Sequence, residues 1–88
     1  MEIIRAAEKE KKRMEEVMKF LEQKKTSKEA KDFYAMAVNY YKDGIYFFDK
    51  KDFLRAFEAF IISWSYVDAG LKMKFFAVPK EQEKWFTA

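Results

Sequence analysis

Residues 53–76, which read FLRAFEAFIISWSYVDAGLKMKFF, contain the apolar pattern that decides the fold. Large apolar side chains recur there every three or four residues, which is the spacing of one face of an α-helix. The members of this stripe are Phe53, Phe57, Phe60, Trp64, Val67, Leu71 and Phe75. Asp52 stands just before it and suits an N-cap, because a carboxylate there accepts a hydrogen bond from a free N–H group of the first turn. The pattern predicts a helix over residues 53–76.

A row of small residues runs beside this stripe and predicts a close helix contact. Ala56, Ser63 and Gly70 follow one another at seven-residue intervals. Small side chains in a row allow a second backbone to approach closely. Gly70 needs such a reason, because glycine inside a helix costs roughly 1 kcal/mol relative to alanine. We therefore expect Gly70 to touch a neighbouring helix and a Gly70→Leu substitution to destabilise the fold through overpacking.

Two further helices are predicted upstream. In TSKE, Thr26 is a suitable N-cap and Glu29 follows three residues later, which is the capping-box pattern of a helix start. This signal predicts a helix over about residues 28–50, whose wide apolar arc suits a helix contacted on two sides. A narrower apolar stripe predicts another helix over about residues 2–24.

The connections between these helices determine the predicted architecture. Only DKKD separates the last two predicted helices, so they should be antiparallel neighbours. We predict an all-α fold: a three-helix, mainly antiparallel bundle over residues 1–78, followed by a short C-terminal tail over residues 79–88. Glycine and proline, which a β-protein would need at its many turns, number only two and one.

The tail carries two large aromatic residues. Pro79 stops helical order, and the polar run after it ends in Trp85 and Phe86. Burying a large apolar side chain contributes about 1.5–3 kcal/mol, so leaving both in water would forgo a large stabilisation. We expect them to dock in the groove between the first and third helices or on a second copy of the chain.

Composition narrows the classes of function. The 88 residues include neither Cys nor His, which removes thiolate chemistry, the commonest general base and the commonest zinc ligand. The net charge of +3 comes from interleaved basic and acidic side chains, so it is weak support for a nucleic-acid surface. No apolar run resembles a signal peptide or a membrane span. We expect a cytoplasmic protein with no catalytic residue, no metal and no other cofactor; its Lys- and Glu-rich composition is typical of hyperthermophiles.

Two aspartates stand at the borders of apolar faces. Asp68 is beside the stripe of the 53–76 helix, and Asp43 has a comparable position on the helix before it. One interpretation is a paired-carboxylate site for acid–base chemistry or for a hard cation such as Mg²⁺. The other, which we favour, is structural, because two carboxylates are fewer ligands than such a site needs and Lys72 is one turn from Asp68.

Tyrosines offer a similar choice. Tyr40 and Tyr66 could stack nucleic-acid bases, but the basic residues do not gather around them. We interpret both as residues at the edge of the core with a solvated hydroxyl.

The segment YYKDGIYFFDKKDFLRAFEAFIISWSYVDAGLKMKFF resembles a known family, the small archaeal helical proteins called domain of unknown function three-five-seven. The resemblance rests on a Tyr-x-x-Asp pattern, an aromatic pair, a turn Asp, an Ala-Phe pair and a Trp…Asp-Ala-Gly run. The matching residues are Tyr40, Asp43, Phe47, Phe48, Asp52, Ala56, Phe57, Trp64, Asp68, Ala69 and Gly70. It implies a helical bundle of archaeal origin with no assigned activity.

The same helix pair is more distantly similar to the nucleotide- and RNA-associated helical domains called HEPN. Active HEPN proteins use an Arg followed by a His. Because this chain has no His, the similarity implies at most a relative that binds without catalysis.

The aromatic content favours a function in protein association. Fourteen aromatic residues lie between Phe33 and Phe76, more than a three-helix core of this size usually encloses. Apolar patches left outside a core tend to be interfaces. We therefore expect a non-catalytic helical module that associates with protein, foremost with itself. The alternative is an RNA- or nucleotide-binding helical protein without catalytic residues, whose binding would weaken steeply with salt.

Overall fold

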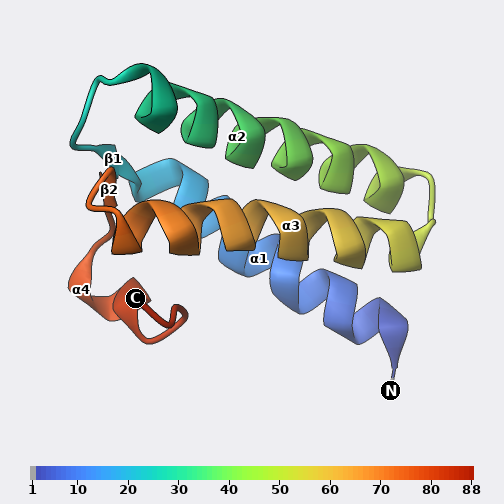
Figure 1. The fold of residues 1–88 in the computed structure, drawn as a ribbon. Coiled ribbons are helices and arrows are strands. Elements are labelled where there is room, and N and C mark those ends of the chain that lie inside the picture. Colours follow the sequence, from blue (N-terminus) through green and yellow to red (C-terminus); the bar gives the residue numbers. More distant parts are fainter. Residues whose placement is uncertain (1) are drawn as a thin grey trace.

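Three long helices form most of the chain, which a computed structural model describes over residues 2–88 (Figure 1). They are α1 (Ile3–Phe20), α2 (Lys28–Asp49) and α3 (Phe53–Lys72), and a one-turn helix, α4 (Lys80–Glu83), follows near the C-terminus. The only strands in this range are β1 (Glu22–Gln23) and β2 (Phe76–Ala77). The predicted all-α, three-helix fold is confirmed. Met1, where the predicted domain begins, lies outside the described residues.

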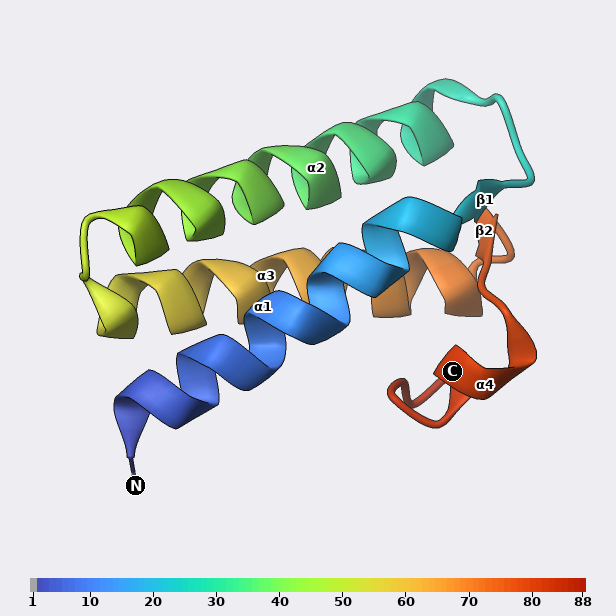
Figure 2. The same ribbon diagram turned by 180° about the vertical axis from the view of Figure 1, so that it is seen from behind.

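The helices are arranged as a hairpin with a third helix across one side. α2 and α3 run antiparallel and in contact along their length, as the short connection predicted (Figure 1). α1 crosses behind α3 in Figure 1 and in front of it in Figure 2, and it contacts α3 much more than α2. Across residues 2–88, every helix is too short or too polar to span a membrane.

The core lies where the three helices meet. Phe60 is fully buried and is the largest side chain in it. The other members of this main cluster come from all three helices: Met14, Val17, Ala37, Ala56 and Val67. A smaller second cluster consists of Ala30, Phe75 and Phe76, and Leu21, Phe33, Tyr34 and Leu71 pack against it.

The first helix is shorter than the predicted range of 2–24. It ends at Phe20, because Leu21 has an extended backbone and packs its side chain towards both clusters. The residues after it form an antiparallel pair with β2, in which Glu22 faces Ala77 and Gln23 faces Phe76. The predicted N-cap of α2 is also off by one residue: Ser27, not Thr26, accepts the hydrogen bond from the N–H of Ala30.

The third helix is shorter than the predicted range of 53–76. It ends at Lys72, and Lys74 then adopts a left-handed conformation with φ of 62°. The N–H of Phe75 donates to the carbonyl of Gly70 at 2.8 Å, which closes a Schellman motif. The turn carries Phe75 and Phe76 back over the helix end, where both are buried. Glycine is the usual residue at such a position, so a lysine there gave no signal in the sequence.

The row of small residues has two different neighbours. Ser63 is fully buried, and its hydroxyl donates to the carbonyl of Ala37 on α2 at 2.6 Å, so this part of the predicted helix contact is confirmed. The expectation for Gly70 was wrong in its partner: the ring of Phe76 packs on it, not another helix. Gly44 on α2 accommodates an aromatic ring in the same way, that of Phe60.

Candidate functional site

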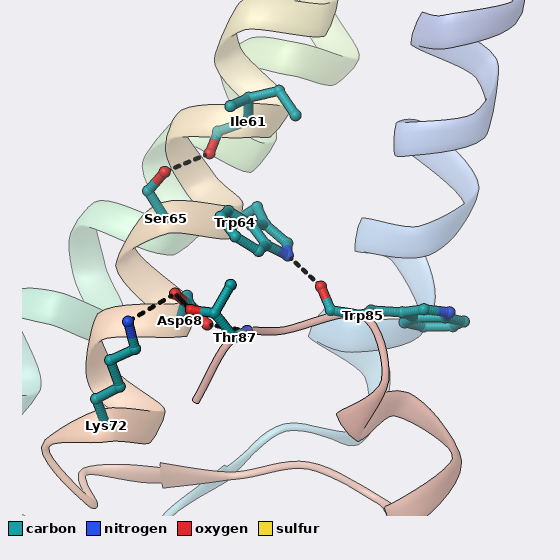
Figure 3. Close-up of polar contacts among 7 residues, drawn as sticks. All are labelled: Ile61, Trp64, Ser65, Asp68, Lys72, Trp85 and Thr87. Carbon is teal, nitrogen blue, oxygen red and sulfur yellow. Dashed lines mark hydrogen bonds and ion pairs between the residues drawn. The ribbon is translucent and has the colours of Figure 1, made fainter.

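Asp68 anchors the end of the chain. Its side chain is buried on α3, with 8% of the residue exposed. One carboxylate oxygen accepts the backbone N–H of Thr87 at 2.8 Å, and the other accepts the Thr87 hydroxyl at 2.6 Å (Figure 3). The ammonium of Lys72, one turn further on, is 3.7 Å from the same carboxylate. These contacts answer why an aspartate stands beside an apolar stripe.

Trp64 holds the same segment one turn earlier on α3. Its indole N–H donates to the carbonyl oxygen of Trp85 at 2.8 Å (Figure 3). Its ring is stacked on that of Phe86, with the centroids 5.7 Å apart and the planes within 5°. The Arg13 guanidinium of α1 is 5.8 Å from the centroid of the Trp85 ring. The expected docking of Trp85 and Phe86 between the first and third helices is confirmed, since both pack against the main cluster.

Gln82 fixes the segment to α1. It is 4% exposed, and its side-chain amide donates to the backbone carbonyl of Glu16 at 3.2 Å. Its buried Oε1 accepts no hydrogen bond from residues 2–88. We call residues 79–88 the tail, and the surface formed by Arg13, Glu16, Trp64 and Asp68 the tail groove. Sequence reasoning found the two tail aromatics but missed Gln82 and Thr87, which are polar residues in a polar run.

The surroundings of Asp68 alter its acidity. Burial alone would raise the pKa of this carboxyl, but the hydrogen bonds from Thr87, the nearby Lys72 ammonium and the backbone N–H of Ala88 outweigh it. The pKa of Asp68 is therefore lower in the folded chain than its ordinary value. A lowered pKa means that the ionised carboxylate stabilises the docked tail.

Replacing Asp68 with Asn should test this role. At neutral pH we expect Asp68→Asn to lower the free energy of unfolding by about 1.5–3 kcal/mol, the range for hydrogen bonds to a charged group. Because the folded pKa lies below the unfolded one, about 3.9, the contribution of the carboxylate is complete above that value and lost as pH falls through the folded pKa. Denaturation measured at pH 7 and in strong acid should show that the difference in the free energy of unfolding between wild type and variant is smaller in acid. A constant difference, or stabilisation of the wild type by Mg²⁺, Mn²⁺ or Ca²⁺, would contradict a structural role.

A second candidate surface lies on the other side of the α2–α3 pair. A groove of about 260 Å³ opens between the two helices. Its lining is Tyr40, Asp43, Phe47, Arg55, Glu58, Ala59 and Ile62. Ile62 is two residues from Trp64, and two residues turn an α-helix by about 200°, so the groove faces away from the tail. We call this surface the outer face.

The tyrosines and Asp43 belong to this outer side. The rings of Tyr40 and Tyr66 are stacked with centroids 6.1 Å apart, which joins α2 to α3 at the edge of the groove. Asp43 is exposed and lines the groove, whereas Asp68 is buried under the tail. The structure does not bring the two carboxylates together, so the paired-carboxylate interpretation was wrong. Within residues 2–88, no cluster of three or more Asp, Glu, His or Cys side chains is placed to hold a metal ion.

Comparison with known proteins gives a family and a fold. The family model described as "Protein of unknown function (DUF357)" matches residues 4–76. The crystal structure of a protein from Archaeoglobus fulgidus, assigned to the same family model, is similar with a TM-score of 0.74 and 28% sequence identity. The similarity covers 89% of this chain and 95% of that one. No curated protein matches the chain. The family match includes every residue of the tail groove and none of the tail.

Proposed function

Because the chain belongs to the DUF357 family, whose function is unknown, we propose a role from its geometry: a non-catalytic helical module that associates with a second copy of itself through the outer face. The observation that carries this proposal is the apolar lining that no described element covers. Ile62, which lines the groove together with Tyr40 and Phe47, is 39% exposed. The groove is lined by residues of α2 and α3 alone, and Ile62 stays exposed among residues 2–88, so α1 does not cover it.

The charges of the outer face favour self-association. Asp43 and Glu58 line the same groove as Arg55. In a two-fold symmetric dimer the same patch meets itself, so each copy must offer both members of every complementary pair. Arg55 of one copy can then face a carboxylate of the other. A surface with two carboxylates for one guanidinium is a poor surface for phosphate.

Composition supports the non-catalytic part of the proposal. The chain has no Cys or His to act as a nucleophile, a base or a soft metal ligand. The buried carboxylate of Asp68 is occupied with Thr87 in a structural contact.

Two matched isoleucine substitutions test the interface. Ile62 on the outer face is 39% exposed, and Ile4 on α1 is 44% exposed. We expect sedimentation equilibrium to give a dimer mass for the wild type, and Ile62→Lys to weaken the dimer at least about tenfold, because it places a charge in the apolar centre of the interface. Ile4→Lys, which makes the same change elsewhere, should leave the dimer intact.

Salt separates this function from the alternative. Association through an apolar face changes little with ionic strength, whereas phosphate binding falls steeply. A wild-type chain that stays monomeric at every concentration would refute self-association, as would an Ile62→Lys chain that dimerises like the wild type. Binding of RNA that disappears at high salt, together with a monomeric mass, would favour the alternative.

A further inference from the structure

We propose that the tail groove is a peptide-binding groove, which the chain's own tail fills and which takes a partner segment of the same chemistry in the same turn conformation. That chemistry is two adjacent large aromatic side chains followed by Ser or Thr. The partner is a segment of another protein. This inference concerns the side of the molecule away from the outer face, so it does not rest on the self-association proposed above.

The contacts that hold the tail are of the kind that hold a peptide. Trp64 donates to a backbone carbonyl, that of Trp85, and Asp68 accepts a backbone N–H, that of Thr87. Such bonds to the main chain do not depend on the side chains of the bound segment, and side-chain contacts then select its sequence. Selection comes here from the stacking of Phe86 on Trp64 and from the Thr87 hydroxyl on Asp68.

The tail is attached in a way that allows it to leave. Within residues 2–88, the backbone hydrogen bonds of the tail stay inside the tail, as from Gln82 to Pro79 and from Trp85 to Gln82. Its polar contacts with α1 and α3 all involve a side chain. By contrast, β2 immediately before it is paired with β1 through the backbone. The tail can therefore dissociate without breaking a strand ladder.

The tail is also an imperfect occupant. Gln82 Oε1 is buried without a donor among residues 2–88, and an unsatisfied buried acceptor has a free-energy cost. A partner segment that supplies a donor there, or places no acceptor there, avoids this cost. The family match over residues 4–76 contains the whole groove and stops before the tail.

Competition between tail and partner leads to a measurable expectation. A tethered segment has an effective concentration in the millimolar range, so the intact tail should compete with a free peptide and weaken its binding to the tail groove. The probe is a synthetic peptide, PKEQEKWFTA, with both ends blocked, and the reporter is the indole N–H signal of Trp64 in ¹⁵N NMR. We expect the peptide to bind a full-length Phe86→Ala/Thr87→Ala chain at least about tenfold more tightly than the wild type, since this change weakens the competing tail.

Two controls place the binding in the groove. In the Phe86→Ala/Thr87→Ala chain, adding Asp68→Ala should lower the affinity for the peptide at least about tenfold. Adding Asp43→Ala instead, which removes a carboxylate from the outer face, should leave the affinity unchanged. A peptide with the same two alanine substitutions should bind at least about tenfold more weakly than the original. Because Asp43 lies on the outer face, these results do not depend on whether that face forms a dimer.

Three outcomes would overturn the proposal. One is no saturable shift of the Trp64 signal in a chain whose other signals remain dispersed and folded. Another is equal affinity of the peptide for the wild-type and weakened-tail chains. The third is a heterodimer formed when the full-length Asp68→Ala and Phe86→Ala/Thr87→Ala chains are mixed, both also carrying Ile62→Lys to weaken association through the outer face, because the occupant would then be the tail of a second copy.

Discussion

Replacing Gly70 with Leu is expected to lower the free energy of unfolding by about 3 kcal/mol or more, at the upper end of the range for overpacking. Even a single Cβ at this position would lie 3.1 Å from Cζ of the Phe76 ring and closer still to two other ring carbons. Leucine adds three further carbon atoms to a site that is already filled. The better helix propensity of leucine, worth less than about 1 kcal/mol, cannot offset this.

Phe76 has little freedom to move away. It is 4% exposed, its ring meets that of Tyr34 edge to face, and its backbone is paired with Gln23. Displacing it would therefore disturb the second cluster and the β1–β2 pair together. We expect Gly70→Leu to change the near-ultraviolet signal of the aromatic residues as well as the stability.

An exposed position of the same helix provides the control for Gly70→Leu. Ser65 faces solvent, and Ser65→Leu should alter the free energy of unfolding by no more than about 0.5 kcal/mol. Urea denaturation of both variants measures the difference. Equal stabilities would mean that the Phe76 ring does not pack on Gly70.

The helix starts and the pairing of α2 with α3 could be predicted because their signals are local. Asp52 caps α3 as expected, accepting a hydrogen bond from the N–H of Arg55, and the short connection enforces the hairpin. The resemblance to domain of unknown function three-five-seven is likewise confirmed by the match over residues 4–76. These features depend on residues close together in the sequence or on a pattern spread over half the chain.

The predicted end of α2, at about residue 50, is one residue past the observed Asp49, but the end of α3 could not be predicted because its residues break the usual preference. Both α2 and α3 end in a turn whose left-handed residue is a lysine, Lys51 with φ of 64° and Lys74 with φ of 62°. A left-handed conformation costs a residue with a side chain roughly 1–2 kcal/mol, so lysine is not a sequence signal for it. The second turn is sustained by burial of Phe75 and Phe76, a tertiary effect.

In the candidate site, too, the tail could be predicted from the sequence only in part. Its aromatic residues predicted that it would dock, because exposed Trp and Phe are costly. The bond from Thr87 to Asp68 joins residues 19 positions apart, and that from Gln82 to Glu16 joins residues 66 apart. No periodicity relates such positions, so the polar half of the tail groove needed the structure.

Gly44→Ala should have the second-largest effect, a loss of about 2 kcal/mol in the free energy of unfolding, although alanine is the better helix former by about 1 kcal/mol. A Cβ on residue 44 would lie 2.9 Å from Cζ of the Phe60 ring, with other ring atoms nearer. Phe60 is fully buried at the centre of the main cluster, so its ring cannot swing into solvent.

A double-mutant cycle distinguishes this steric cause from a general weakening of α2. Phe60→Leu alone should cost about 1–3 kcal/mol through the space it leaves. In the Gly44→Ala/Phe60→Leu chain the new methyl group occupies part of that space. The free energy of unfolding lost by this double variant should therefore be at least about 1 kcal/mol smaller than the sum of the two single losses. Phe75 belongs to the second cluster and is 8% exposed, so Gly44→Ala combined with Phe75→Leu should be additive within about 0.5 kcal/mol. If both cycles were additive, a clash between the new methyl group and the Phe60 ring would not be the cause of the loss in the Gly44→Ala chain.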